Sequence, residues 1–383
     1  MADKRKLFLI SPMLHQGGFE RVCITTARLL KEEYDVTIVI FDDANIAYDV
    51  TGLNIVNLDC PVRKGKVAKI ANVIKRSSKL RALKKAKMPE ISYSFGPTAN
   101  IVNSLSAVSG VKIWTGLRNY TDVLNVRNMK LFMKKSDVIV CCSKEIEAYL
   151  ASEFNYHKTA TLYNLYDLKT IKEESEGKIA DWPWPGGVDD NGNKLRILVS
   201  MGRDDDQKCF WHMIKAFYHI HNAVPNARLV LLGAGSFENS KTLAKELGIY
   251  EYIFFAGMRK DPYKFLSRAE IYLLTSYNEG FPNALVEGMS LGLAPVATNC
   301  LTGPKEILTP TDGEHYGILM PLMSENRNYE SNNLEEEKPY ADAVINLLND
   351  DELLNETKSL AQKRAMDFSY ESYKERFIEL TNA

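Results

Sequence analysis

Short apolar stretches alternate with longer helical patterns along most of the chain. In the first half these stretches are rich in β-branched and aromatic residues, and they cover residues 7–10, 36–41, 91–95, 111–115 and 138–142. Continuous apolar runs of this length are typical of strands buried on both faces, and their alternation with helices indicates βαβ units. The pattern therefore predicts a parallel sheet that helices cover on both sides.

The alternation stops over residues 172–193 and then starts again. The interrupting segment is rich in Glu, Asp, Gly and Pro and contains Trp182 and Trp184, which favours a linker or a surface excursion. After it, further strands are expected at residues 196–201, 228–232, 252–256, 270–275 and 294–298. An acidic, Asn-rich loop is expected at 324–337, followed by helices at 340–348, 352–366 and 370–380. Two Rossmann-like α/β halves that face each other across a cleft would explain this order.

Composition narrows the class of protein. A length of 383 residues exceeds the usual single core and suggests two domains, and 45% hydrophobic with 25% charged residues is ordinary for a globular protein. A net charge of -1 gives no support for nucleic-acid binding. The six cysteines lack metal-site or disulfide spacing and are expected to be buried thiols of a reducing compartment. Neither a signal peptide nor a run of about 20 apolar residues is evident, so we expect a cytoplasmic protein.

Candidate chemistry is concentrated just after the expected strand at 270–275. Glu279 lies in the loop above the strand, and Glu287 lies on the first turns of the helix that Pro282 and Asn283 are suited to begin. In an open α/β sheet, ligands bind at the carboxyl ends of the strands, and a helix N-terminus there offers N–H groups to an anion. A ligand with both phosphate and hydroxyl groups would suit this arrangement.

Glu279 and Glu287, followed by Gly292, Pro295 and Val296, resemble the Glu-x7-Glu signature of retaining GT-B glycosyltransferases of family 4. The run 303–308 is similar to that of bacterial capsule, exopolysaccharide and oligosaccharide transferases. The resemblance implies an acceptor-binding domain at 1–170, a linker at 171–194, a nucleotide-sugar domain at 195–366 and a final helix at 367–383 that crosses back to the first domain.

The same resemblance assigns roles around the donor. Glu287 would bind the ribose hydroxyls, and Glu279 would bind hydroxyls of the donor sugar. Arg203 and Lys208 would hold the diphosphate and offset the charge that grows as it leaves. The other donor-binding residues implied are Gly17, Gly18, Gly202, Gly257, Met258, Gly280, Phe281, Pro282, Asn283, Leu285 and Val286.

Three departures from the family pattern stand out. Cys209 replaces the glycine that usually follows the lysine, and Asp204, Asp205 and Asp206 look like the metal-binding acidic motif of a different transferase fold. Because basic residues can take the metal's role, we expect these aspartates to be a solvated loop and the protein to need neither metal nor cofactor. Arg118 lies where family members often have a histidine, so we expect it to assist catalysis, with a donor phosphate oxygen accepting the acceptor's proton. His15, near the glycine pair, is either a second cleft residue or a solvated loop histidine.

A basic amphipathic segment covers residues 63–87. It contains eleven Lys or Arg residues and no acid, with Val67, Ile70 and Ile74 among the interleaved apolar residues. One interpretation is a docked helix with a basic outer face. The other is attachment to an anionic membrane surface, the inner face of the plasma membrane.

The resulting hypothesis is a retaining hexosyltransferase that moves a sugar from a nucleotide sugar, UDP-linked in our prediction, to a glycan acceptor that is lipid-linked. Two alternatives remain open at this stage. One is a nucleotide-sugar epimerase, and the other is a non-catalytic subunit that binds nucleotide sugar in a polysaccharide assembly.

Overall fold

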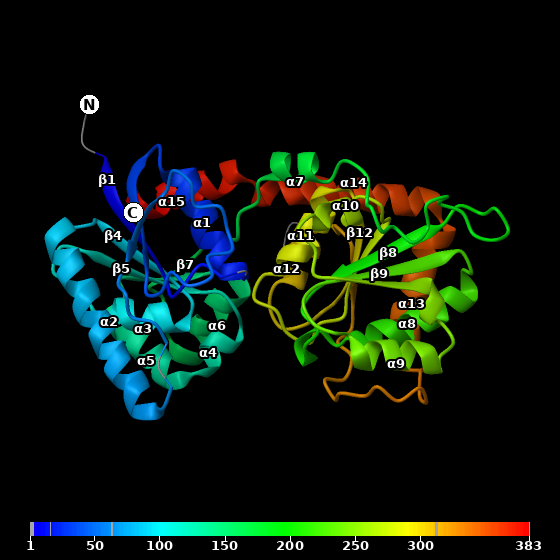
Figure 1. Ribbon diagram of the computed structural model, residues 1–383, viewed down its shortest axis with the longest axis horizontal. Coiled ribbons are helices and arrows are strands. Elements are labelled where there is room, and N and C mark those ends of the chain that lie inside the picture. The colour runs from blue at the N-terminus through cyan, green and yellow to red at the C-terminus, as the bar shows by residue number, and fades with distance from the viewer. Residues whose placement is uncertain (1–3, 16, 63, 311–312, 383) are drawn as a thin grey trace. The chain divides into compact units, whose positions relative to one another are not determined.

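The computed structural model describes residues 4–15, 17–62, 64–310 and 313–382. Met1–Asp3 of the N-terminal segment, Gln16 beside the glycine pair and Arg63 of the basic segment lie outside the described residues. Contacts divide the chain into two units: unit 1 comprises residues 1–165 and 370–383, and unit 2 comprises residues 166–369. Each unit is an α/β layer structure built on one parallel sheet (Figure 1).

Unit 1 has a seven-stranded sheet in the order β3-β2-β1-β4-β5-β6-β7. Its strands are β1 (Arg5–Ser11), β2 (Tyr34–Ile40), β3 (Asn54–Asn57), β4 (Ile91–Phe95), β5 (Lys112–Leu117), β6 (Val138–Cys141) and β7 (Thr159–Thr161). Its helices are α1 (Gly18–Leu30), α2 (Lys66–Lys87), α3 (Pro97–Leu105), α4 (Thr121–Leu124), α5 (Val126–Lys135), α6 (Lys144–Phe154) and α15 (Tyr370–Asn382).

Unit 2 has a six-stranded sheet in the order β10-β9-β8-β11-β12-β13. Its strands are β8 (Arg196–Met201), β9 (Ala227–Leu232), β10 (Ile253–Gly257), β11 (Ile271–Leu274), β12 (Ala294–Thr298) and β13 (Ile318–Met320). Its α-helices are α7 (Leu168–Glu174), α8 (Phe210–Ala223), α9 (Glu238–Glu246), α10 (Pro262–Leu266), α11 (Asn283–Ser290), α12 (Pro304–Leu308), α13 (Lys338–Asn349) and α14 (Asp351–Ala365), with short 3₁₀ turns η1 (Asp206–Lys208), η2 (Tyr250–Tyr252) and η3 (Met366–Phe368).

The predicted doubly wound α/β class is confirmed in both units. All strand pairs in the two sheets are parallel, as the unbroken apolar runs predicted. The sequence pattern missed β3, β7 and β13, which have only four, three and three residues. Strands this short lack enough residues to show a period, and each lies at or near a sheet edge.

The division at Leu165 and Ser369 gives unit 1 the last helix. Phe377 of α15 packs against Trp114 of β5 with ring centroids 5.6 Å apart, and Tyr373 donates to or accepts from Thr26 of α1 at 2.9 Å. The segment 171–194 packs within unit 2, where the ring centroids of Trp182 and Phe265 lie 6.3 Å apart. The domain boundaries at 170, 194 and 366 remain predictions; these contacts place the ends of unit 2 at Tyr166 and Ser369.

Helix α2 is docked through only part of its apolar residues: Leu80 is buried, and Val73 and Leu83 pack against the same core cluster. Val67, Ile70 and Ile74, which lie nearer the start of the helix, are 82%, 64% and 64% exposed. Arg76 and Lys84 are buried as well. Arg76 donates two hydrogen bonds to the Cys60 carbonyl, which explains how a guanidinium is accommodated beneath the helix.

Two further expectations can be compared with the described residues. All six cysteines are buried, and they form no disulfide bond with one another, as expected from their spacing. Among the described helices, none combines the length and the apolar character that crossing a membrane requires.

Candidate functional site

The topological switch point of unit 2 lies between β8 and β11. The chain runs outward from β8 to β9 and β10 on one side, and from β11 to β12 and β13 on the other. At such a point the loops after the two central strands separate and leave room for a ligand. The loop after β8 carries Gly202, Arg203 and Lys208, and the loop after β11 carries Glu279, so the sheet brings the predicted residues to one place.

Lys208 and Glu279 form a mostly buried ion pair across this switch point. Lys208 Nζ lies 2.5 Å from Glu279 Oε1, and Ser276 Oγ donates to the same oxygen at 2.7 Å. Gln207 donates to the Asn278 carbonyl at 2.8 Å, which ties the two loops together. The carboxylate is therefore held in one orientation, with a positive charge beside it.

The backbone around Glu279 is also fixed. Glu279 N–H donates to the Leu301 carbonyl at 3.0 Å, and the Thr302 hydroxyl donates to the Glu279 carbonyl. Gly303 has a φ of +94°, and a Cβ there would lie 2.6 Å from Pro282 Cδ. Only glycine fits this approach, so the residues following β12 support the loop that precedes α11.

Glu287 is buried rather than a solvated helix residue. It is 1% exposed on α11, and Tyr263 donates a hydrogen bond to its Oε1 at 3.3 Å. The adjacent Gly288 packs against Tyr272, whose ring would be 3.0 Å from a Cβ at that position. Close packing of α11 on β11 thus holds this carboxylate at the inner side of the helix.

Arg203 differs from Lys208 in its surroundings. Its side chain is 74% exposed and pairs with Asp205 at 3.1 Å. Asp204 is more than a solvated residue, because its Oδ2 accepts the Phe237 N–H at 2.7 Å. Asp206 pairs instead with Arg327 at 3.4 Å, so the three aspartates contact different partners.

The remaining predicted donor residues of unit 2 fall into two groups. Leu285 and Val286 are fully buried, so their side chains belong to the core and only their main chain could meet a ligand. Gly280 and Phe281 precede α11 and Pro282 is its N-cap, while Asn283 accepts a hydrogen bond from Tyr166 at 2.6 Å. Gly257, with a φ of +68°, ends β10, and the following Met258 is 57% exposed.

In unit 1, Gly17 and Gly18 lie where β1 leads into α1. The Tyr48 hydroxyl donates to the Gly17 carbonyl at 2.8 Å, and a Cβ at Gly17 would collide with the Glu20 carboxylate. Burial raises the pKa of the Glu20 carboxyl. His15 Nε2 lies 2.8 Å from the Ala44 carbonyl, so this ring has a loop partner within unit 1.

Arg118 lies at the end of β5 in a network of unit 1. Its terminal nitrogens donate to Tyr93 and, at 3.0 Å, to Asn164, and its guanidinium lies 5.0 Å from the Phe95 ring centroid. Burial raises the pKa of Tyr93, so it remains a neutral phenol beside this charge. One further donor, the Nε–H of Arg118, is buried and has no hydrogen-bond partner among the described residues.

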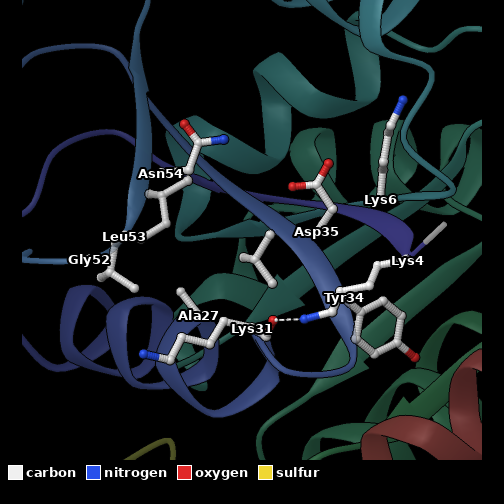
Figure 2. A pocket seen from close by; sticks show the side chains of 11 residues that line it. Lys4, Lys6, Ala27, Lys31, Tyr34, Asp35, Gly52, Leu53 and Asn54 are labelled. Atoms are coloured by element: carbon white, nitrogen blue, oxygen red, sulfur yellow. Dashed lines mark hydrogen bonds between the residues drawn. The ribbon is translucent and has the colours of Figure 1, made fainter. Parts of the chain in front are cut away.

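A cavity of about 490 Å³ in unit 1 lies away from these residues. Figure 2 shows Lys4, Lys31, Tyr34 and Asn54 around it, and Lys4 Nζ donates to the Lys31 carbonyl at 2.9 Å. These residues lie at the amino ends of β1, β2 and β3. Gly17 and Gly18 follow the opposite, carboxyl end of β1, where α/β sheets usually bind ligands.

Several residues that hold the site were not anticipated from the sequence. They are Gln207, Tyr263, Ser276 and Thr302. Each acts through a contact with a residue far along the chain or through a turn, and no spacing pattern marks such contacts in a single sequence.

The comparisons with known proteins agree with this geometry. Residues 189–364 match the family model of glycosyl transferases group 1. The matched segment, which is most of unit 2, thus has the sequence features of the group 1 glycosyl transferases. An uncharacterized glycosyltransferase of Methanocaldococcus jannaschii is 30% identical over 259 residues, so the match spans 63% of this chain and 62% of that protein.

Two further similarities cover almost the whole chain. A Campylobacter jejuni enzyme, N-acetylgalactosamine-N,N'-diacetylbacillosaminyl-diphospho-undecaprenol 4-alpha-N-acetylgalactosaminyltransferase, is 24% identical over 95% of this chain and 96% of its own. The crystal structure of Anabaena HepE in complex with UDP and glucose has a TM-score of 0.75 and 15% identity, and covers 99% of this chain and all of that one. The structural similarity shows the GT-B class of fold, with two Rossmann-like domains.

Proposed function

We propose that this glycosyltransferase moves a sugar, with retention of anomeric configuration, from a UDP-linked donor to a polyprenyl-diphosphate-linked glycan. The observation that carries the proposal is the Lys208–Glu279 pair at the switch point of unit 2, with the buried Glu287 on the helix that follows. The Campylobacter relative, which acts on an undecaprenol-linked substrate, supports the acceptor class. It also favours an N-acetylhexosamine as the transferred sugar.

The donor would be held by basic side chains at its diphosphate and by carboxylates at its hydroxyl groups. Arg203 and Lys208 bind the diphosphate oxygens, and the buried Glu287 accepts hydrogen bonds from the ribose hydroxyls. The sugar hydroxyls would bind to Glu279 and to the main chain of Gly280, Phe281 and Pro282.

The nucleotide base would lie against Gly257 and Met258. The first turn of α11, which contains Asn283, Leu285 and Val286, has N–H groups that favour an anion. Gly202 leaves space beside the diphosphate.

The transfer would use positioning and charge rather than a protein base. The bond between the anomeric carbon and the diphosphate oxygen breaks, and the acceptor oxygen forms its bond on the same face of the sugar. The acceptor's proton passes to a departing phosphate oxygen. Arg203 and Lys208 offset the charge on the leaving UDP, so we propose that the reaction requires no metal ion.

The lipid-linked acceptor requires the enzyme to work at a membrane. Helix α2 presents Val67, Ile70 and Ile74 to solvent along one stripe, next to exposed lysines such as Lys66 and Lys69. Exposed apolar groups within a basic surface are typical of helices that lie on anionic lipid. We propose that α2 rests on the inner face of the plasma membrane.

The donor site can be tested by calorimetric titration with UDP, GDP and ADP in EDTA. We expect UDP to bind most tightly, and Arg203→Ala and Glu287→Gln each to weaken it about 10- to 100-fold, since each removes a charge-assisted hydrogen bond. Arg268→Ala, which removes an exposed arginine of the same unit, is the matched control. If UDP bound equally well to all four proteins, the site would lie elsewhere. Release of an epimerised nucleotide sugar without acceptor would favour an epimerase instead.

A further inference from the structure

Among the described residues, one cluster of His and acidic side chains is arranged to hold a cation. It comprises His212 on α8 together with Glu336 and Glu337, which immediately precede α13, and one possible ligand atom from each lies within 4.8 Å of the others. His212 and Glu337 are 2% and 1% exposed, while Glu336 is exposed. Helices α8 and α13 pack side by side in unit 2, which brings the three residues together (Figure 1).

Both ring nitrogens of His212 face oxygen atoms. Nε2 lies 2.7 Å from the Ser324 carbonyl, and Nδ1 lies 2.6 Å from Glu337 Oε1. A carbonyl oxygen only accepts hydrogen bonds, so Nε2 must carry a hydrogen. In the neutral ring this leaves the lone pair of Nδ1 directed at a carboxylate oxygen. Nδ1 and Glu337 must therefore share a cation, either a proton, which fits the 2.6 Å separation as it stands, or a metal ion, which would move the two ligand atoms farther apart.

Charge balance favours the metal ion. With a proton, one imidazolium faces two carboxylates and the cluster keeps a net negative charge, with the buried Glu337 inside and Glu336 on the exposed side. With a divalent ion, a neutral imidazole and two carboxylates, the net charge of the cluster is zero. The second oxygen of Glu337, Oε2, is buried and has no hydrogen-bond partner among the described residues. An ion bound at this carboxylate would satisfy that oxygen as well.

We propose that His212, Glu336 and Glu337 bind a divalent transition metal ion, with Zn²⁺ as the best fit. One imidazole nitrogen with carboxylate oxygens suits Zn²⁺, whereas Mg²⁺ and Ca²⁺ prefer oxygen ligands alone. The hydrogen bond from Nε2 to Ser324 is the kind of outer contact that usually orients a metal-binding histidine. Because Glu336 is exposed, water can complete the coordination from that side.

The ion would fasten the segment 321–337 to α8. This segment also contacts the loop after β8, where Arg327 pairs with Asp206 at 3.4 Å, and α8 itself, where Tyr329 packs against Trp211 with ring centroids 5.6 Å apart. None of the three ligands is a proposed donor residue. The ion is therefore structural, and sugar transfer itself stays independent of metal.

The test uses the full chain, without a histidine tag and stripped of metal with EDTA that is then removed. Zn²⁺ alone is titrated by calorimetry, and thermal unfolding is followed with and without it. We expect one Zn²⁺ per chain and a higher Tm in its presence. Glu336→Gln should weaken binding about tenfold or more, since losing a ligand costs at least as much as losing an outer partner.

Glu335→Gln is the matched control, because it removes the same charge from the neighbouring exposed residue outside the cluster. Its Zn²⁺ affinity should stay within about threefold of wild type. Both variants change exposed side chains, so neither is expected to unfold the protein. Absence of stoichiometric binding in wild type, or equal weakening by the two variants, would overturn the proposal and leave a proton between His212 and Glu337.

Discussion

Lys84 shows how one buried charge can be tolerated in unit 1. The side chain is fully buried beneath α2, and its Nζ donates to Asn103 Oδ1 at 2.7 Å and to Ser106 Oγ at 2.9 Å. Burial, together with the nearby positive charge of Arg81, lowers the pKa of Lys84 to about 7. Polar partners satisfy the amine hydrogens, but no carboxylate was found as its ion-pair partner among the described residues.

This pKa predicts a pH-dependent stability. Between pH 7 and about 10.5 the unfolded chain binds a proton that the folded chain releases, so the free energy of unfolding rises with pH over this window. Below pH 7 both states are protonated and the full penalty of burial applies. Relative to Lys84→Met, wild type should gain on the order of 2 kcal/mol between pH 7 and 9.5, measured by urea unfolding. Parallel pH profiles for the two proteins would contradict the prediction.

At the scale of elements, helix α15 completes the core of unit 1. Phe377 is fully buried. Its ring centroid lies 5.8 Å from the ring centroid of Tyr34 and 5.6 Å from that of Trp114. Tyr34 also shares a hydrogen bond with Thr381 at 2.8 Å. The end of the chain therefore stabilises strands formed by its beginning, although more than 300 residues lie between them.

Phe377→Ala is expected to destabilise unit 1 by about 3–5 kcal/mol, because it removes a large buried side chain and leaves a cavity. In scanning calorimetry the transition of unit 1 should move to lower temperature while that of unit 2 stays in place. Glu375→Ala, an exposed change on the same helix, should leave both transitions nearly unchanged. Equal shifts of both transitions by Phe377→Ala would mean that α15 does not belong to unit 1 alone.

At the scale of the whole molecule, charge is unevenly distributed. The net charge is -1, yet residues 63–87 contain eleven basic residues and no acid. Attraction to an anionic surface would thus be local to α2 rather than a property of the entire protein. The exposed apolar stripe of the same helix adds a contribution that salt does not screen.

Replacing Val67, Ile70 and Ile74 together by Ser should therefore weaken binding to vesicles of anionic phospholipid about tenfold or more. Flotation of the protein with vesicles measures this, at low and at high salt. The control replaces the comparably exposed Leu124, Val126 and Val188 by Ser, and it should bind like wild type. If both triple variants bound as well as wild type, α2 would not be the membrane contact.

The sequence alone was sufficient for the α/β class, ten of the strands, and the placement of Glu279 and Lys208 at strand ends. These features follow from local patterns of apolar residues and from spacing within short segments. It could not determine the short strands β3, β7 and β13, the outward face of α2 or the packing of α15 on β5. The Lys208–Glu279 pair and the His212–Glu337 contact were equally beyond it, because they join segments 71 and 125 residues apart. Such contacts exist only when sheet order and helix packing bring distant residues together, so the tertiary structure alone decided them.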